Sequence, residues 1–138
     1  MYSQDRQKQR EFLASAWQKH LNNDNLEPLE RQLVLIVESH PEYHKIINNL
    51  TTEYFPEQGE INPFLHINLH LALKDQISIN QPHEISSIYQ KLLKKHKDPH
   101  EVEHLMMECI AEMIFISQKN NSGLDESKYI LNLKNLLN

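Results

Sequence analysis

The chain has 138 residues, 39% of them hydrophobic and 24% charged, a composition typical of a folded domain rather than a disordered chain. Its 14 Lys and Arg against 19 Asp and Glu give a formal net charge of -5, which argues against a general affinity for the phosphate backbone of nucleic acids. We expect a single domain, because one hydrophobic core usually serves about 100 to 200 residues.

The amino terminus, MYSQDRQKQREF, is polar and lacks the apolar run of a signal peptide. No stretch approaches the roughly 20 apolar residues that a transmembrane helix needs. Cys109 is the only cysteine, which excludes an intrachain disulfide and a cysteine-rich zinc site. These features predict a cytoplasmic protein that does not contact the membrane.

Apolar residues at helical spacing organise the first third of the chain. From residue 3 to about residue 21 they recur at three- and four-residue intervals, which predicts an amphipathic helix. A second helix is predicted to begin near Pro28, because a proline in the first turn loses no hydrogen bond. Pro41 disfavours helical geometry at His40, so we expect a break there and a short helix after it.

Start signals place the remaining helices. The Asn-Pro pair at 62–63 caps and opens a helix that is expected to run to about residue 76. The stretch 80–82 ends that helix and precedes another with an apolar face. The Asp-Pro pair at 98–99 begins a helix that should reach about residue 117, and Asp125 caps the last one.

The helix that begins at residue 98 is nearly apolar all round in its second half, which is typical of a central helix. Ala111 and Phe115 continue a stripe of polar residues on this helix, which indicates that the end of the stripe is covered. No alternating pattern of useful length predicts a strand. The predicted fold class is therefore all-α, a single-domain helical bundle of about five to seven helices.

Two histidines one turn apart mark the 62–76 helix. His66 and His70 share a helical sector with Leu73 and Ile77, so they are predicted to point inward. Two imidazoles at i and i+4 can reach one ion, which is the use of this spacing in helical metal sites. The zinc-protease motif places a glutamate directly after its first histidine, but here that position is Ile67, so this interpretation lacks its general base.

The helix that begins at residue 98 could complete a metal site. Glu101, His104, Glu108 and Glu112 line one stripe of it and include one Glu-x-x-His motif. Carboxylate-bridged di-iron and di-manganese bundles use two such motifs, so a site for one ion is favoured here. The metal is expected to be zinc, iron or manganese. The predicted ligands are His66, His70, His104 and Glu108, with Glu101 as a further candidate.

Two alternative interpretations of these residues involve no metal. The histidines can be core residues bonded to carbonyls or carboxylates, and the glutamate stripe can be a solvated helix face. Whether the protein is an enzyme is left open by the sequence. The alternative function is a non-enzymatic protein–protein interaction module, for example a homodimer. Its contact surface is either the irregular loop around Tyr54 and Phe55, since loops often carry function, or an apolar helix face.

Several strings of the sequence carry a resemblance to a known family. They are Arg10-Glu11-Phe12, Ala16-Trp17-Gln18-Lys19, His40-Pro41-Glu42-Tyr43-His44, Pro56-Glu57-Gln58-Gly59, Asn62-Pro63-Phe64-Leu65-His66, Leu69-His70-Leu71-Ala72, Gln81-Pro82 and His104-Leu105-Met106-Met107-Glu108-Cys109. On these strings, which span nearly the whole chain, the protein resembles the bacterial domain of unknown function 1841 family. The resemblance implies a soluble bacterial protein with no inherited catalytic role, and it includes the same two helices.

Overall fold

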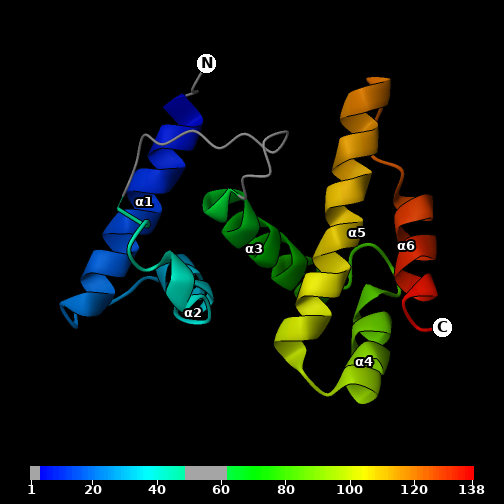
Figure 1. Cartoon of the computed structure of the whole chain (residues 1–138), viewed down its shortest axis with the longest axis horizontal. Coiled ribbons are helices and arrows are strands. Elements are labelled where there is room, and N and C mark those ends of the chain that lie inside the picture. The colour runs from blue at the N-terminus through cyan, green and yellow to red at the C-terminus, as the bar shows by residue number, and fades with distance from the viewer. Residues whose placement is uncertain (1–3, 49–61) are drawn as a thin grey trace. The chain divides into compact units, whose positions relative to one another are not determined.

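The computed structural model describes residues 4–48 and 62–138. In these residues the chain forms six α-helices and one 3-10 helix and contains no strand (Figure 1), which confirms the all-α class and the number of helices. None of these helices combines the length and the apolar composition needed to cross a bilayer. The elements in chain order are α1 (Gln4–Leu21), α2 (Pro28–Glu38), the 3-10 helix η1 (Pro41–Tyr43), α3 (Pro63–Ile79), α4 (Ile85–His96), α5 (Pro99–Asn120) and α6 (Glu126–Asn135).

Two compact units divide the chain, an N-terminal unit Met1–Leu71 and a C-terminal unit Ala72–Asn138. The boundary falls within α3, so the first half of this helix belongs to one unit and the second half to the other. That the whole chain forms one domain stays a prediction.

The start of α3 follows from its asparagine cap. Asn62 Oδ1 accepts the backbone N–H groups of Phe64 and Leu65 at 2.9 and 3.2 Å, and Pro63 occupies the first helical position. An asparagine cap of this kind satisfies donors that have no partner within the helix. The predicted start of α3 is therefore confirmed, while its end lies at Ile79 instead of near residue 76.

Aspartates open α5 and α6 in the same way. Asp98 Oδ1 accepts the backbone N–H of His100 at 3.0 Å, and Asp125 Oδ1 accepts that of Lys128 at 3.1 Å. Both caps were predicted from the sequence and both are confirmed. The α5 helix continues to Asn120, three residues beyond the predicted end.

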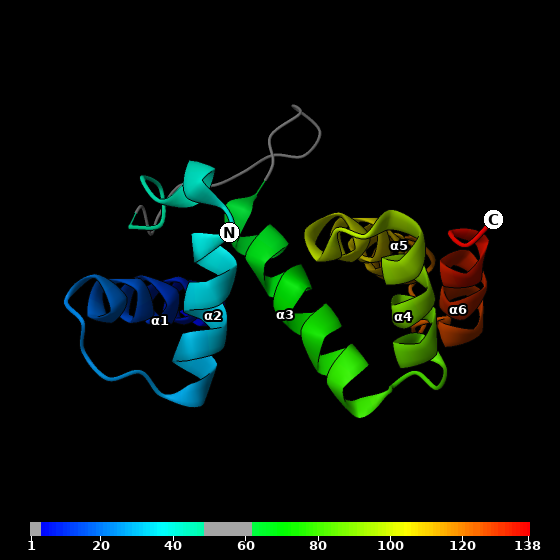
Figure 2. The same ribbon diagram turned by 90° about the horizontal axis from the view of Figure 1, so that it is seen from below.

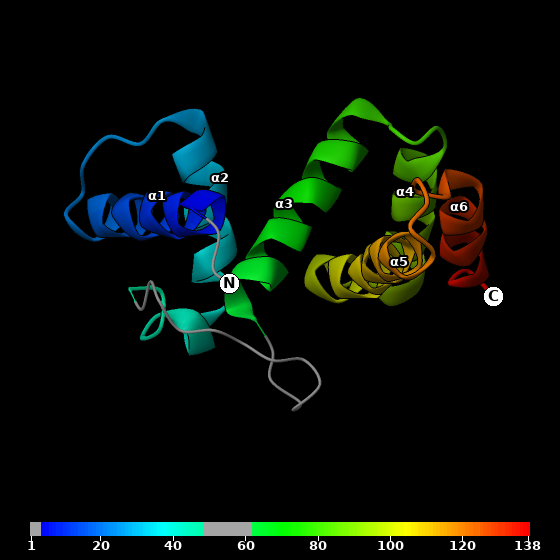
Figure 3. The same cartoon turned by 90° about the horizontal axis from the view of Figure 1, so that it is seen from above.

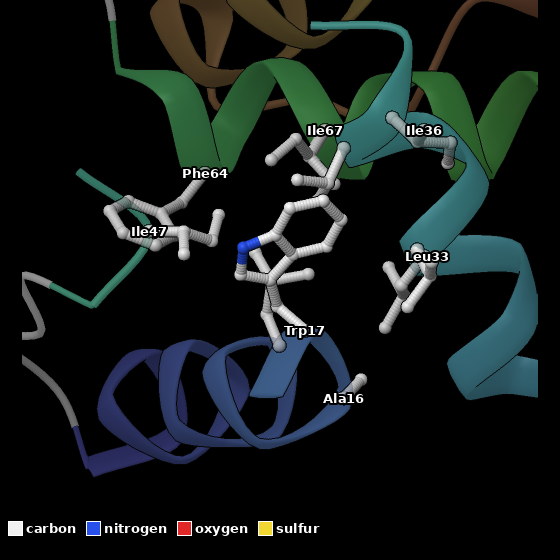
Figure 4. Close-up of a cluster of buried hydrophobic side chains, with 10 residues drawn as sticks. Ala16, Trp17, Leu33, Ile36, Ile47, Phe64 and Ile67 are labelled. Carbon is white, nitrogen blue, oxygen red and sulfur yellow. The ribbon is translucent and has the colours of Figure 1, made fainter. Parts of the chain in front are cut away.

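The core of the N-terminal unit gathers around the only tryptophan of the chain, Trp17. Its indole lies among apolar side chains from α2, α3 and the turn that follows η1 (Figure 4). Figure 2 shows that α1 and α2, which contact each other, cross at a steep angle. The buried members of the cluster are Leu13, Ala16, Trp17, Leu33, Val34, Ile36, Val37, Ile47, Phe64 and Ile67.

An ion pair also links α1 to α2. Lys19 Nζ lies 2.9 Å from Glu30 Oε2. The backbone N–H of Glu27 and the Lys19 ammonium together hold the pKa of Glu30 below its ordinary value. The bond from Glu30 raises the pKa of Lys19 in turn, so each charge stabilises the other at neutral pH.

The C-terminal unit is built from α4, α5 and α6, which contact one another (Figure 3). The second half of α3 joins them through polar contacts. The hydroxyl of Tyr129 donates to Gln76 Oε1 at 2.6 Å, and Lys74 Nζ lies 3.3 Å from Oε2 of the buried Glu103.

The second half of α5 is less covered than its apolar sequence predicts. The buried residues of this helix lie between Val102 and Ile110, whereas Phe115 is 62% exposed and Ala111 is exposed. The predicted covering of the stripe end is therefore wrong, although α5 contacts both α4 and α6 within the C-terminal unit.

Candidate metal centre

His66 and His70 lie one turn apart in the first half of α3. His70 is only 2% exposed and His66 is half-buried, while Asn68 on the opposite side of the helix is exposed. Their rings meet edge to face, with centroids 4.8 Å apart. The predicted inward direction of the pair is confirmed.

A third histidine, His40, joins this pair from another part of the N-terminal unit. It lies between α2 and η1 and is 2% exposed. Its Nε2 is 3.1 Å from Nε2 of His66 and 3.2 Å from Nε2 of His70. The three side chains therefore converge through the same ring nitrogen. Because 26 and 30 residues separate His40 from the other two, helical periodicity gives no sign of the contact.

The opposite edge of the His40 ring is fixed by the end of α2. Nδ1 lies 2.7 Å from the backbone carbonyl oxygen of Ile36. A carbonyl oxygen can only accept, so Nδ1 carries a proton and donates it to Ile36. In the neutral ring, Nε2 then holds a lone pair directed at the other two histidines. Metal-binding histidines are typically held in this way, with the second ring nitrogen donating to a carbonyl or carboxylate.

The spacing of the nitrogens matches that of ligands around one ion. Two nitrogens at about 2.1 Å from a metal lie ~3.0 Å apart at a right angle and ~3.4 Å apart at the tetrahedral angle. The observed 3.1 and 3.2 Å fall between these limits. Since the single lone pair of His40 Nε2 accepts one ring N–H well, hydrogen bonding accounts for only one of the two contacts. The group can hold a metal ion, as the clustering of its ligand atoms also indicates.

The ring of Tyr43 covers His40. The two rings are stacked with an interplanar angle of 6° and centroids 5.2 Å apart, and Tyr43 meets His66 edge to face at 6.0 Å. Burial, and secondarily the charge of Glu42, raises the pKa of Tyr43. The phenol is therefore neutral at physiological pH and supplies an apolar wall beside the imidazoles.

The other predicted site residues lie on α5 in the C-terminal unit. His104 is half-buried, and its ring centroid is 4.1 Å from that of His100. Glu101 is exposed and its Oε1 lies 3.6 Å from Nδ1 of His96. Glu108 is exposed as well. The assignment of His104, Glu108 and Glu101 as metal ligands stays a prediction.

Two other features of the C-terminal unit are poor candidates for a site. Cys109 is buried, and burial, followed by the charges of Glu112 and Glu108, raises its pKa to about 11, so it is a thiol rather than a nucleophilic thiolate. A pocket of about 110 Å³ lies between the end of α5 and the start of α6, well below the roughly 300 to 1,000 Å³ of typical small-molecule sites. The histidine group of the N-terminal unit is the stronger candidate.

Comparison with known proteins identifies the family but gives no activity. No curated protein and no solved structure matches the chain. A family model described as a domain of unknown function (DUF1841) matches residues 5–135. The match includes all three converging histidines, and it confirms the resemblance that the sequence strings carry. The chain therefore belongs to the domain of unknown function 1841 family.

Proposed function

We propose that the protein binds one divalent transition-metal ion through Nε2 of His40, His66 and His70. The observation that carries the proposal is the approach of two imidazole nitrogens to within 3.2 Å of a third whose other nitrogen donates to a backbone carbonyl. Buried histidines that serve packing alone need no such convergence, since each can be satisfied by its own carbonyl or carboxylate.

The donor type narrows the choice of metal. Neutral imidazole suits zinc, copper, iron and nickel, whereas manganese prefers carboxylate, carbonyl and water oxygens. Among the zinc, iron and manganese expected from the sequence, three imidazoles therefore favour zinc or iron.

Three ligands leave at least one coordination position on such an ion. The sequence predicts His104 and Glu108 as further ligands. Glu101 is the weakest of the predicted ligands, because it is exposed and already faces His96. An ion held by His40, His66 and His70 alone would keep a position for water or a small ligand.

The direct test is metal content. Untagged protein purified without chelators should contain close to one equivalent of metal by elemental analysis. Protein stripped with a chelator and titrated with Zn²⁺ in a calorimeter should bind one equivalent. His40→Ala, His66→Ala and His70→Ala should each abolish stoichiometric binding, because each removes one of the converging nitrogens.

His20→Ala is the matched control, since this histidine lies in the same unit and contacts Glu38 instead, at 3.4 Å. It should bind metal as the unsubstituted protein does. Stripped protein that takes up no Zn²⁺, or equal loss in the His20 variant, would overturn the proposal. His104→Ala and Glu108→Ala then test the sequence assignments, which are wrong if the affinity is unchanged.

The alternative function, a homodimer or a protein contact through Tyr54 and Phe55, concerns residues outside the described part of the chain. It stays a prediction. Changing both residues to serine should convert any dimer to monomer by light scattering, and an unchanged mass would contradict this contact.

A further inference from the structure

We infer that Ser39 is a positioning residue for the metal ligand His40, and that its hydroxyl helps to select the imidazole tautomer that presents Nε2 to His66 and His70. The inference rests on the proposed metal site. It adds a residue that does not itself reach the ion.

The geometry is a closed set of three polar groups at the C-terminal end of α2. Ser39 Oγ lies 2.7 Å from the carbonyl oxygen of Ile36 and 3.1 Å from Nδ1 of His40. Nδ1 is itself 2.7 Å from the same carbonyl. The carbonyl oxygen has two lone pairs and can accept both donors at once.

Only one arrangement of the Ser39 hydroxyl hydrogen and the His40 ring proton fits these distances. The Ser39 hydroxyl donates to Ile36, because a carbonyl cannot donate. Its oxygen then turns lone pairs toward Nδ1 of His40, so the imidazole meets two acceptors on that edge. Both acceptors favour a proton on Nδ1 and leave the lone pair on Nε2.

The tautomer of His40 with its proton on Nε2 would be unfavourable for two reasons. An unprotonated Nδ1 would face the Ile36 oxygen at 2.7 Å with no hydrogen between the two lone pairs. Its Nε2 would carry a proton directed at His66 and His70, and a protonated nitrogen cannot bind a metal. The Ile36 carbonyl opposes this tautomer whatever residue stands at 39. The Ser39 hydroxyl adds to that preference and is the part that a substitution can remove.

The backbone explains why these groups meet. Ser39 is the C-cap of α2 and retains helical geometry, while His40, with φ -128° and ψ 72°, leaves the helix. The chain direction changes between them, as the following proline predicts. The side chain of His40 can therefore turn back over the last turn of α2, where the carbonyl of Ile36 has no partner within the helix.

The test compares Ser39→Ala with Ser39→Thr, which keeps the hydroxyl. Loss of a group that orients a metal ligand typically weakens metal affinity about 10- to 100-fold. Because the Ile36 carbonyl remains, we expect a Zn²⁺ dissociation constant about tenfold higher for the alanine variant and near-normal binding for the threonine variant. Ser86→Ala is the matched control, because the Ser86 hydroxyl also donates to a helix carbonyl, that of Ile77 at 2.6 Å, but lies in the C-terminal unit.

A second readout does not depend on metal. Nitrogen-15 NMR of the metal-free protein reports which nitrogen of His40 carries the proton. Ser39→Ala should shift the population toward the Nε2–H tautomer, and the threonine and Ser86 variants should not. An alanine variant with unchanged tautomer and unchanged affinity would overturn the inference. If no variant binds Zn²⁺, the proposed function fails, and the NMR result alone then decides the role of Ser39.

Discussion

Ile67→Ala tests whether one face of α3 packs against the apolar core of the N-terminal unit while the neighbouring face carries His66 and His70. Ile67 is fully buried against the cluster that contains Trp17 (Figure 4). The substitution removes about three buried carbon groups, worth roughly 0.8 kcal/mol each in transfer free energy. The cavity left behind raises the expected loss of unfolding free energy to about 3 to 4 kcal/mol.

Trp17 is the natural probe, because it is the only tryptophan and lies in the same cluster. Urea unfolding followed by its fluorescence should show the loss, and the melting temperature should fall by roughly 12 to 16 °C. Leu65→Ala is the control on the same helix, since Leu65 is 51% exposed and its truncation should cost below about 1 kcal/mol. Equal losses in the two variants would refute the orientation assigned to α3.

Three further predictions concern single groups. Because the pKa of Glu30 is lowered from 4.5 in the folded chain, its stabilising effect is present above pH 4.5 and lost as the pH falls through the folded value. The stability advantage over Glu30→Gln should shrink in urea titrations at successively lower pH below that point; a constant difference would contradict this. With a pKa of about 11, Cys109 should react with iodoacetamide at pH 8 far more slowly in the folded chain than in urea, and equal rates would count against its burial. Tyr129→Phe removes the hydrogen bond to Gln76 and should lower the unfolding free energy, measured by calorimetry, by about 0.5 to 1.5 kcal/mol. An unchanged unfolding free energy would contradict a stabilising role for this bond.

Local signals predicted the helices well because capping acts over a few residues. Asn62, Asp98 and Asp125 each accept backbone N–H groups at the helix starts that the sequence indicates. Helix ends were less certain, since no short-range signal fixes where the last turn stops. The exposure of Ala111 and Phe115 on α5 was not predicted, because the sequence of one helix does not reveal which of its residues the neighbouring helices cover.

The sequence predicted the pairing of His66 and His70 but not the approach of His40, and the reason is geometric. His66 and His70 share one helix, so the angle of about 100° per residue places them together without knowledge of the rest of the fold. His40 reaches them only because α2 and α3 pack around the same core, and that packing is a property of the folded unit. The same angle places Ile67 beside His66 but in the apolar cluster. A glutamate at position 67 would therefore enter the core around Trp17, so the missing carboxylate of the zinc-protease pattern and the buried isoleucine have one physical cause.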